Sequence, residues 1–435
     1  MAIPTGVACA CGRVHEPLPT KIIIRAGAVE SLPILAGELA EGVPLVLFDP
    51  VTHRLAGENI ARAFIRADKP WERLVLGSES APFEPNEAAL EAVRATIKDK
   101  QPGLVAGVGA GAMNDLGKFV AHEAGLPYIS VATAPSMDGY MAPISALLIG
   151  GVKVTYDTKA PDGVIADLDV LAGAPMSLVS AGFADVVGKL TSLRDWELAR
   201  VLFGEYWCRA VSDHVEGIAS RLFAAAGALA ERSHDSVRLL MEGLLEAGIS
   251  VFHVGSSRPT SGSEHLVSHY VEMRRFNEGG RPPAHGHVVG FGMLVIAELA
   301  EKMRGLRAED VRKTRFTPAD MEQVLAELRL DEVPGNFGKS KFDAEIRDAR
   351  LPVIASRWDD ILAVLEKVPP AHKIREGLAR VGAPTNLRDL GLDPETAMDT
   401  VLHARYMRER YTMLDLAAEL GVLEAQAANI VRKYA

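Results

Sequence analysis

Through its first 170 residues the chain alternates short apolar, β-branched runs with longer stretches of helical spacing, and this alternation limits the possible folds more than any other feature. Five runs predict strands, at residues 20–26, 43–49, 71–77, 103–109 and 128–133. Four stretches between them predict helices, at residues 28–42, 52–67, 86–99 and 114–125. Strands that alternate with helices pair in parallel, so we predict an α/β doubly wound sheet.

From about Pro175 onward the apolar pattern is almost entirely helical, as in residues 213–231. A chain of 435 residues is too long for a single hydrophobic core. We therefore predict two domains, an α/β domain at residues 1–172 and an all-α domain at residues 173–435.

The overall charge argues against two kinds of partner. The formal net charge is −10, whereas nucleic acids and anionic membranes attract basic surfaces. The longest uncharged apolar stretch, residues 139–152, contains Pro143 and is too short to span a bilayer. The N-terminus lacks the apolar core of a secretory signal. We expect no nucleic acid, no membrane span and a cytoplasmic location.

The three cysteines do not form a disulfide framework. Cys9 and Cys11 precede His15 in "CACGRVH", which could be half of a zinc site. A structural zinc site needs four ligands, and the remaining cysteine, Cys208, is far away in the sequence. We therefore interpret the N-terminal segment as a solvated, reduced arm.

A glycine-rich segment, "AGVGAGAMNDLGK" (residues 106–118), follows a predicted strand and opens a predicted helix. Gly107, Gly109 and Ala112 match the loose G-x-G-x-x-G/A pattern, whose amides can cradle a pyrophosphate. The acidic residue expected about 20 positions later is absent. Asp49, at the end of the second predicted strand, could instead meet a ribose hydroxyl. A simple tight turn explains the glycines equally well.

Four of the twelve histidines fall within a short stretch of the helical half: His265, His269, His285 and His287. His265 and His269 share one face of a predicted helix. Each histidine alone is more often a structural or exposed residue than a ligand.

Asp185 lies in the apolar helical segment "SAGFADVVGKLTSLRDW" (residues 180–196), with Lys189 one turn later. The two could form an ordinary surface ion pair. A buried carboxylate there would need a partner or a metal. One carboxylate and two imidazoles make a three-ligand metal site with an open position. The pattern alone does not decide which histidines take part.

Five segments, in this order, resemble the sn-glycerol-1-phosphate dehydrogenase family: "GVGAGAMND", "SVATAPSMDGY", "GFADVVGK", "SGSEHLVSH" and "HGHVVGFG". This family belongs to the superfamily of dehydroquinate synthase and iron-containing alcohol dehydrogenases. The resemblance covers nearly the whole chain, and its N-terminal "CACGRVH" and C-terminal "RYTMLDLAAELGVL" are similar to the bacterial branch. "TAPSMDG" and "GSEHLVSH" are specific, whereas the glycine loop is shared across the superfamily.

The resemblance implies a role for each candidate residue. The ligands of one divalent metal, zinc or nickel, would be Asp185, His265 and His285. The catalytic residues would be His269 and Asp138, and the substrate would contact Asp138, Asp185 and His269. NAD, or NADP, would contact Asp49 on its adenosine side, the loop Gly109, Ala110, Gly111, Ala112 and Met113, and the segment Thr133, Ala134, Pro135 and Ser136.

The implied reaction reduces dihydroxyacetone phosphate to sn-glycerol 1-phosphate with hydride from the nicotinamide. The metal would stabilise the developing alkoxide, and His269 would supply a proton. Lys118, Lys153 and Lys189 are candidates to bind the phosphate of this small anionic substrate. A homo-oligomer, a dimer or larger, is expected.

The chain departs from the family pattern at two positions. His287 stands where the family usually has Glu, and Ala142 replaces a Ser that contacts NAD in many members. The first departure bears on the surroundings of the metal and the second on the nicotinamide contact.

Three alternatives remain. A dehydroquinate-synthase-like cyclase would recycle NADH rather than consume it, and another polyol or alcohol dehydrogenase of the superfamily would accept a different substrate. Residues 412–434 also resemble a helix-turn-helix. Residues 404–435, however, hold five basic and four acidic side chains, which is too neutral for DNA binding.

Overall fold

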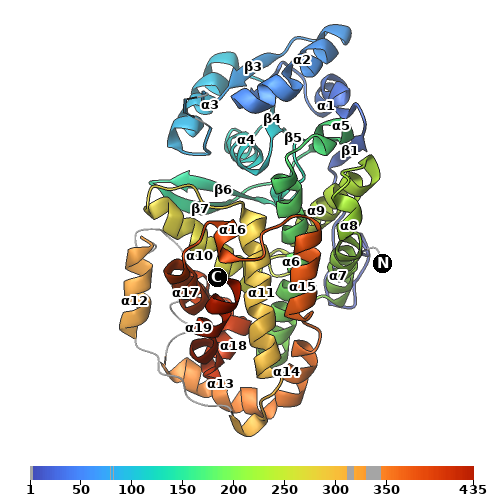
Figure 1. Ribbon diagram of the computed structural model, residues 1–435. Helices are drawn as coiled ribbons and strands as arrows, with labels where there is room; N and C mark the ends of the chain where they lie inside the picture. Colours follow the sequence, from blue (N-terminus) through green and yellow to red (C-terminus); the bar gives the residue numbers. More distant parts are fainter. Residues whose placement is uncertain (1–2, 79, 82, 311–317, 330–343) are drawn as a thin grey trace. The chain divides into compact units, whose positions relative to one another are not determined.

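The computed structural model describes residues 3–78, 80–81, 83–310, 318–329 and 344–435 (Figure 1). Their contacts define two compact units. The sheet unit comprises Glu16–Gly182 and Gly227–His253, and the helical unit comprises Met1–His15, Phe183–Ala226 and Val254–Ala435. The predicted α/β part, followed by a mostly helical part, is confirmed.

The sheet unit is built on six parallel strands in the order β1-β8-β5-β4-β2-β3. They are β1 (Lys21–Arg25), β2 (Pro44–Phe48), β3 (Glu72–Val75), β4 (Leu104–Gly109), β5 (Tyr128–Ala132) and β8 (Gly163–Asp167). Every residue of β2, β4, β5 and β8 is buried, as expected for strands covered on both faces.

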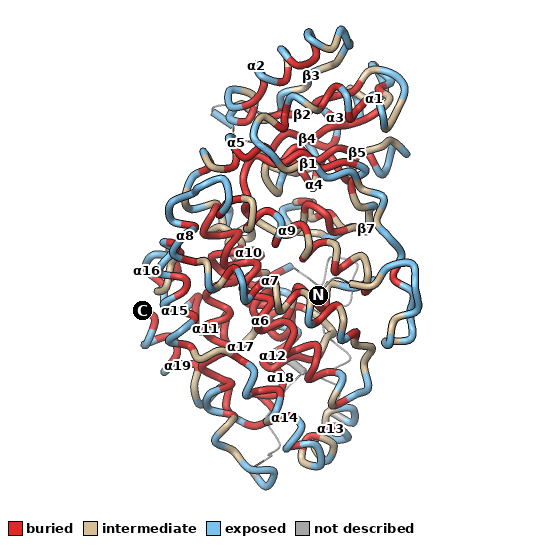
Figure 2. Tube along the Cα trace, turned by 90° about the vertical axis from the view of Figure 1, so that its right-hand side faces the viewer, coloured by how far each residue is buried: buried red, intermediate tan, exposed pale blue. Residues whose placement is uncertain are grey.

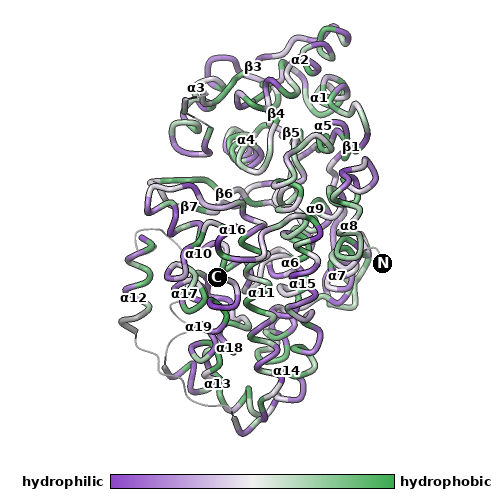
Figure 3. The backbone as a smooth tube through the Cα atoms, viewed as in Figure 1, coloured by the Kyte–Doolittle hydropathy of each residue, from purple (hydrophilic) through white to green (hydrophobic). Residues whose placement is uncertain are grey.

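Helices cover both faces of this sheet, which makes it doubly wound. They include α1 (Leu32–Leu39), α2 (Pro50–Arg66), α3 (Glu87–Lys100), α4 (Gly111–Glu123) and α9 (His234–Val254). Alternate residues of β2 point to opposite faces: Val46 packs with α1 and α2, whereas Leu47 packs with α3 and α4. Figure 3 shows the matching alternation of hydrophobic and hydrophilic residues along α2 and α3.

Three strands were not predicted. β6 (Ile144–Ile149) and β7 (Val152–Asp157) form an antiparallel hairpin, and β8 completes the centre of the sheet. The hairpin turn uses Gly150 and Gly151, whose φ angles of +59° and +79° suit a tight two-residue turn. The apolar stretch at residues 139–152 is therefore largely a strand. Among the described residues, no helix is long and apolar enough to cross a membrane.

The helical unit has a core of three long helices, α6 (Met176–Phe203), α10 (Ser263–Asn277) and α11 (His285–Met303). All three are buried along most of their length (Figure 2). α10 and α11 pack directly on one another: a Cβ added at Gly292 of α11 would lie 2.5 Å from the carbonyl oxygen of Glu264 on α10. The remaining helices of this unit include α7 (Arg209–Ala224), α14 (Trp358–Leu365), α15 (Ala371–Arg380), α17 (Pro394–His403), α18 (Met413–Glu419) and α19 (Val422–Tyr434).

The two compact units are not separated at a single point in the sequence such as residue 172. The first 15 residues belong to the helical unit, and residues 227–253, with most of α9, belong to the sheet unit. α9 joins the sheet unit because Val237, Met241 and Leu245 pack in one cluster with residues of β5 and β8.

The interpretation of the N-terminal segment as a solvated arm is wrong. His15 is only 1% exposed. Ile3, Cys9 and Cys11 pack against buried residues of α6 and α7, together with Cys208. Apolar contacts and burial of an imidazole hold this segment in the helical unit.

Gly182 of α6 provides a test of packing within the sheet unit. A Cβ at this position would lie 1.9 Å from the carbonyl oxygen of Pro135. Because backbone cannot yield as a flexible side chain does, Gly182→Ala should lower the free energy of unfolding by roughly 1–3 kcal/mol. Gly227→Ala is the matched control, since that exposed helical glycine has no atom within 4 Å of the added Cβ. Thermal denaturation of both variants checks this prediction, and equal melting temperatures would contradict it.

Candidate active site

Three of the predicted ligands converge within the helical unit. One ligand atom each from Asp185, His265 and His285 lies within 4.8 Å of the others. They come from the buried part of α6, the first turn of α10 and the first residue of α11. His265 Nε2 lies 3.4 Å from Asp185 Oδ1, and the two imidazole rings are 5.2 Å apart, centroid to centroid. The three helices thus bring together one carboxylate and two imidazoles.

Each imidazole is oriented by a carboxylate on α10. His265 Nδ1 lies 2.7 Å from Glu264 Oε1, and His285 Nδ1 lies 2.5 Å from Glu272 Oε1. Ser268 Oγ also donates to Glu272, over 3.1 Å. A ring that donates from Nδ1 keeps the lone pair of Nε2 for a metal, and such carboxylate–histidine pairs are typical around bound metal ions. The chemistry of the group therefore fits a divalent cation.

Asp185 is completely buried and ionised. Its Oδ1 accepts a hydrogen bond of 2.6 Å from Lys189 Nζ, and both side chains are 0% exposed. Burial favours the neutral acid, but the charge of Lys189 and the contact with His265 outweigh this effect and keep the pKa of Asp185 below its usual range. The alternative of a surface ion pair is therefore wrong: the pair exists, but in the interior.

His269 also belongs to this group, whereas His287 has a different environment. The ring of His269 lies 6.1 Å from that of His265 and 5.9 Å from that of His285, measured between centroids. It is half-buried, so water or a small molecule can reach it. His287 is 9% exposed, and burial lowers its pKa. The structure gives no role to the substitution of His287 for the family's usual Glu.

Asp195 of α6 holds the start of α10 in place. Its Oδ2 accepts a hydrogen bond of 2.5 Å from Ser263 N, and its Oδ1 accepts one of 2.6 Å from Met413 N. One buried carboxylate thus binds the first amides of both α10 and α18, where helix N-termini carry unpaired donors. The position of His265, in the first turn of α10, depends on this contact.

In the sheet unit, the predicted dinucleotide residues lie where the strand order reverses. The chain runs from β2 to the edge strand β3 and then returns to β4, on the other side of β2. Ligands bind parallel sheets at the carboxyl ends of strands that flank such a point. Asp49 directly follows β2, and Gly109 ends β4. The register of Leu47 with Gly107 places these two carboxyl ends side by side.

The glycine loop permits close packing and leaves the amino end of α4 uncapped by a side chain. A Cβ at Gly109 would lie 2.4 Å from Met113 Cβ. The N-cap residue Ala110 is extended and provides no side-chain hydrogen bond to α4. Ala112, in the first turn, is exposed. Amides at such a helix N-terminus favour a phosphate group.

The second predicted cofactor segment, Thr133–Ser136, lies beside this loop. The amide of Thr133 donates to the carbonyl oxygen of Gly109 over 3.2 Å. Tyr140 Oη donates to the carbonyl oxygen of Ala134 over 2.6 Å. The segment is therefore held against the glycine loop, and its residues are buried.

Asp49 has a structural role that the sequence analysis missed. Its Oδ1 accepts hydrogen bonds from the amides of Val51 and Thr52, at 2.7 and 2.9 Å. Thr52 Oγ1 in turn accepts from the amide of Asp49, which completes a capping box for α2. The carboxylate is therefore fixed in orientation at the end of β2.

Asp138 opens the short helix η2 (Asp138–Tyr140) of the sheet unit, and it is half-buried. The segment is anchored by Lys118, whose buried Nζ donates to the carbonyl oxygens of Gly139 and Ala142, each over 2.8 Å. Burial lowers the pKa of Lys118 to about 8. Lys118 thus donates hydrogen bonds to backbone carbonyl oxygens, and Lys189 donates one to Asp185. Of the three lysine candidates for the phosphate, Lys153 is the half-buried one.

Three carboxylates that support the histidines were not predicted: Glu264, Glu272 and Asp195. A signal for Glu272 was present, because it lies seven residues after His265 and therefore on the same helical face. Glu264 is adjacent to His265 in the sequence, a spacing from which no side-chain contact is expected on a helix, and Asp195 binds backbone amides of two distant segments.

Comparisons with known proteins identify relatives along almost the whole chain. A family model described as iron-containing alcohol dehydrogenase matches residues 23–175. Glycerol-1-phosphate dehydrogenase (NAD(P)+) of Bacillus licheniformis is 31% identical over 418 residues, covering 96% of this chain and 93% of the relative. The enzyme of the same name from Hyperthermus butylicus is 34% identical over 290 residues, covering 65% of this chain and 78% of the relative.

Solved structures agree on the fold. A probable glycerol dehydrogenase from Sinorhizobium meliloti 1021 superposes with a TM-score of 0.61 at 18% identity, covering 95% of this chain and 98% of the other. Fold, sequence identity and family match point to one assignment. The chain belongs to the glycerol-1-phosphate dehydrogenase family, within the iron-containing alcohol dehydrogenases.

Proposed function

We propose that this protein is a metal-dependent, NAD-linked dehydrogenase that interconverts dihydroxyacetone phosphate and sn-glycerol 1-phosphate. The observation that carries the proposal is the convergence of Asp185, His265 and His285 within 4.8 Å. The name of the relatives, glycerol-1-phosphate dehydrogenase (NAD(P)+), supports the substrate and the use of NAD(P). The resemblance to this family also supports a cytoplasmic homo-oligomer, a dimer or larger.

One carboxylate and two imidazoles are ligands suited to zinc or nickel, the two ions that we propose. When bound there, a divalent ion would act as a Lewis acid toward the oxygen of the substrate carbonyl. Asp185 contributes the negative charge, and Glu264 and Glu272 orient the two histidines. These residues are fixed by buried hydrogen bonds before any substrate arrives.

His269 and Asp138 are the proposed catalytic residues. The half-buried His269 lies on the same face of α10 as His265, so it can hold the proton that the developing alkoxide requires. We propose that Asp138 contacts the substrate hydroxyl, and that Lys153 contributes to binding of the phosphate. The two lysines already engaged with Asp185 and with backbone carbonyls are less suited to that task.

The cofactor NADH would bind at the carboxyl ends of β2, β4 and β5. The N-terminus of α4 suits its pyrophosphate, and the segment Thr133–Ser136 lies next to the glycine loop. Asp49, at the end of β2, would accept hydrogen bonds from the ribose diol. Ala142 is 3% exposed and carries no hydroxyl, so the contact of the family's usual Ser with NAD is absent.

The direct test of function follows NADH oxidation with dihydroxyacetone phosphate, and then assays the product with an enantiomer-specific enzyme. Consumption of NADH with formation of sn-glycerol 1-phosphate supports the proposal. Recycling of NADH without net consumption would indicate a cyclase, and the opposite enantiomer would refute the assigned stereochemistry.

Asp185→Asn tests the metal ligands. The substitution keeps the shape of the side chain but removes the charge that balances a dication, so the protein should lose one equivalent of metal and its activity. Elemental analysis and an NADH fluorescence titration on the same sample measure both properties. NADH binding should persist, because the proposed cofactor residues lie in the sheet unit. His372→Ala, at an exposed position of α15, is the control and should keep its metal. Full metal content and near-normal turnover in Asp185→Asn would refute the site.

His269→Ala separates chemistry from metal binding. We expect the variant to retain its metal and to lose turnover by a factor on the order of 10²–10⁴, the usual contribution of a general acid. Metal analysis and steady-state kinetics distinguish the alternatives. Loss of metal in this variant would make His269 a ligand and contradict the assigned roles.

Asp49→Asn tests cofactor choice. A carboxylate at this position repels a 2′-phosphate, so the wild-type protein should prefer NADH to NADPH. Asparagine preserves the helix cap but removes the charge, and the ratio of kcat/KM values for the two cofactors should move toward one. If the ratio of kcat/KM values does not change, or if the wild-type protein does not prefer NADH to NADPH, the assignment of Asp49 to the cofactor site is wrong.

A further inference from the structure

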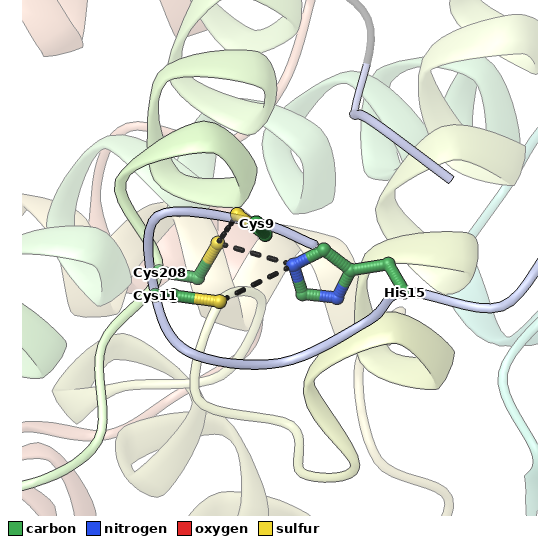
Figure 4. Close-up of side chains that lie close together, drawn as sticks. All are labelled: Cys9, Cys11, His15 and Cys208. Carbon is green, nitrogen blue, oxygen red and sulfur yellow. Dashed lines mark hydrogen bonds between the residues drawn. The ribbon is translucent and has the colours of Figure 1, made fainter. Parts of the chain in front are cut away.

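A second group of metal-ligand side chains lies in the helical unit, formed by Cys9, Cys11, His15 and Cys208 (Figure 4). One ligand atom from each residue lies within 4.8 Å of the others. Cys9 Sγ is 3.7 Å from Cys208 Sγ. His15 Nε2 is 3.5 Å from Cys11 Sγ and 3.4 Å from Cys208 Sγ. Three thiols and one imidazole nitrogen thus point toward a common centre.

These distances match the edges of a zinc tetrahedron. With Zn–S bonds of about 2.3 Å and Zn–N bonds of about 2.0–2.1 Å, tetrahedral angles place two sulfur ligands about 3.8 Å apart and a sulfur and a nitrogen about 3.6 Å apart. Three of the six distances between ligand atoms, 3.7, 3.5 and 3.4 Å, agree with these values within about 0.2 Å, and all six are within 4.8 Å. The side chains are therefore arranged for an ion without large movement.

The N-terminal segment forms a tight hairpin that presents its ligands together. Ala8 and Val14 make an antiparallel bridge. The amide of Cys9 donates to the carbonyl oxygen of Arg13 over 2.9 Å, and that of Gly12 donates to the carbonyl oxygen of Cys9 over 3.0 Å. Gly12 has a φ of +86°, a conformation that glycine adopts without strain. The turn brings Cys9 and Cys11 close to His15.

The fourth member comes from the amino end of α7. Cys208 is the N-cap residue of this 16-residue helix and is completely buried. A sequence separation of 193 residues from His15 hides this contact from any spacing motif.

Neither a disulfide nor ordinary packing accounts for this arrangement. The sulfur atoms of Cys9 and Cys208 are 3.7 Å apart, far beyond the about 2.05 Å of a disulfide bond, and all three cysteines are free thiols. Ordinary packing of buried thiols as small apolar groups does not require an imidazole nitrogen at the same centre. His15, 1% exposed, instead directs its Nε2 toward two sulfur atoms.

Neighbouring side chains complement the charge of a filled site. Three thiolates and a dication leave one net negative charge. The guanidinium of Arg13 lies 3.4 Å from the ring centroid of Tyr206, whose hydroxyl is 3.3 Å from Cys11 Sγ. Arg13 also donates to the carbonyl oxygen of Val254 over 2.9 Å. A hydroxyl thus contacts one of the sulfur ligands, and a cation packs on the ring that carries this hydroxyl, which is compatible with a metal site.

We propose that Cys9, Cys11, His15 and Cys208 bind one zinc ion in a closed structural site. The thiols release their protons to solvent on binding, and the protein fills all four positions, so none remains for a substrate. Soft thiolates in tetrahedral geometry favour zinc. The ion fastens the N-terminal hairpin to the start of α7. This proposal does not depend on the proposed dehydrogenase activity.

Metal analysis of the full-length protein tests the site. In an Asp185→Asn background, which removes a ligand from the other group, one equivalent of zinc should remain. Adding Cys9→Ser and Cys11→Ser should remove that equivalent and lower the melting temperature by several degrees. His372→Ala is the control, which keeps all four ligands and should keep the zinc. Zinc content that does not change in the cysteine variant would overturn the proposal.

Cobalt substitution gives a second measurement that distinguishes the two groups. Cobalt bound by thiolates absorbs in the near ultraviolet through sulfur-to-metal charge transfer, which a carboxylate and imidazole site cannot produce. The band should appear in wild-type protein and in Asp185→Asn, and it should be absent from the Cys9→Ser, Cys11→Ser variant.

The wild-type protein alone provides a test if the cysteine variant does not fold. Its three thiols should react slowly with a thiol reagent until a chelator removes the zinc, and quickly afterwards. Equal rates before and after chelation, or a Cys9–Cys208 disulfide found by mass spectrometry of freshly purified protein, would overturn the proposal.

Discussion

A carboxylate with no contact to water dominates the interior of the helical unit. Asp185 is 0% exposed, and an isolated charge in that position would cost free energy comparable to the net stability of a protein. The surrounding helices therefore have to supply compensating groups: Lys189 from the next turn of α6 and His265 from α10. The packing of α6 against α10 and α11 follows from this requirement as much as from hydrophobic burial.

Two further buried carboxylates, Glu264 and Asp195, also form hydrogen bonds in the interior of the helical unit. Glu264 accepts hydrogen bonds from Thr191 and from the amide of Gly262, in addition to its contact with His265. Asp195 binds the first amides of two helices, and burial raises its pKa to about 7. A network of this kind is stable only when every member is paired, so it allows few alternative positions for the histidines. Rigidity of this kind suits a site that must hold a metal and its substrate in one geometry.

Sequence patterns predicted most strands of the parallel sheet because strand and helix formation depend largely on residues that are close in the sequence. Alternating strands and helices, with β-branched runs such as 103–109, specify parallel pairing without knowledge of distant contacts. The β6–β7 hairpin was missed because Pro143 and two glycines interrupt an otherwise apolar stretch. The residues alone left the ligand histidines undecided, and the family resemblance was needed to select them. Cys208 could not be placed at all, since its proximity to His15 depends on tertiary folding.

The two side-chain groups of the helical unit differ in the way that separates catalytic from structural metal sites. Asp185, His265 and His285 are the three proposed ligands of the first group, and the half-buried His269 lies beside them. A fourth position there can admit a substrate oxygen. The cysteine group provides four ligands, with His15 and Cys208 buried, and sulfur donors that neutralise the charge of a dication. Such a site has no position left for chemistry, and its free energy of binding contributes directly to folding. The two proposed sites of the helical unit would thus have different roles, one in catalysis and one in stability.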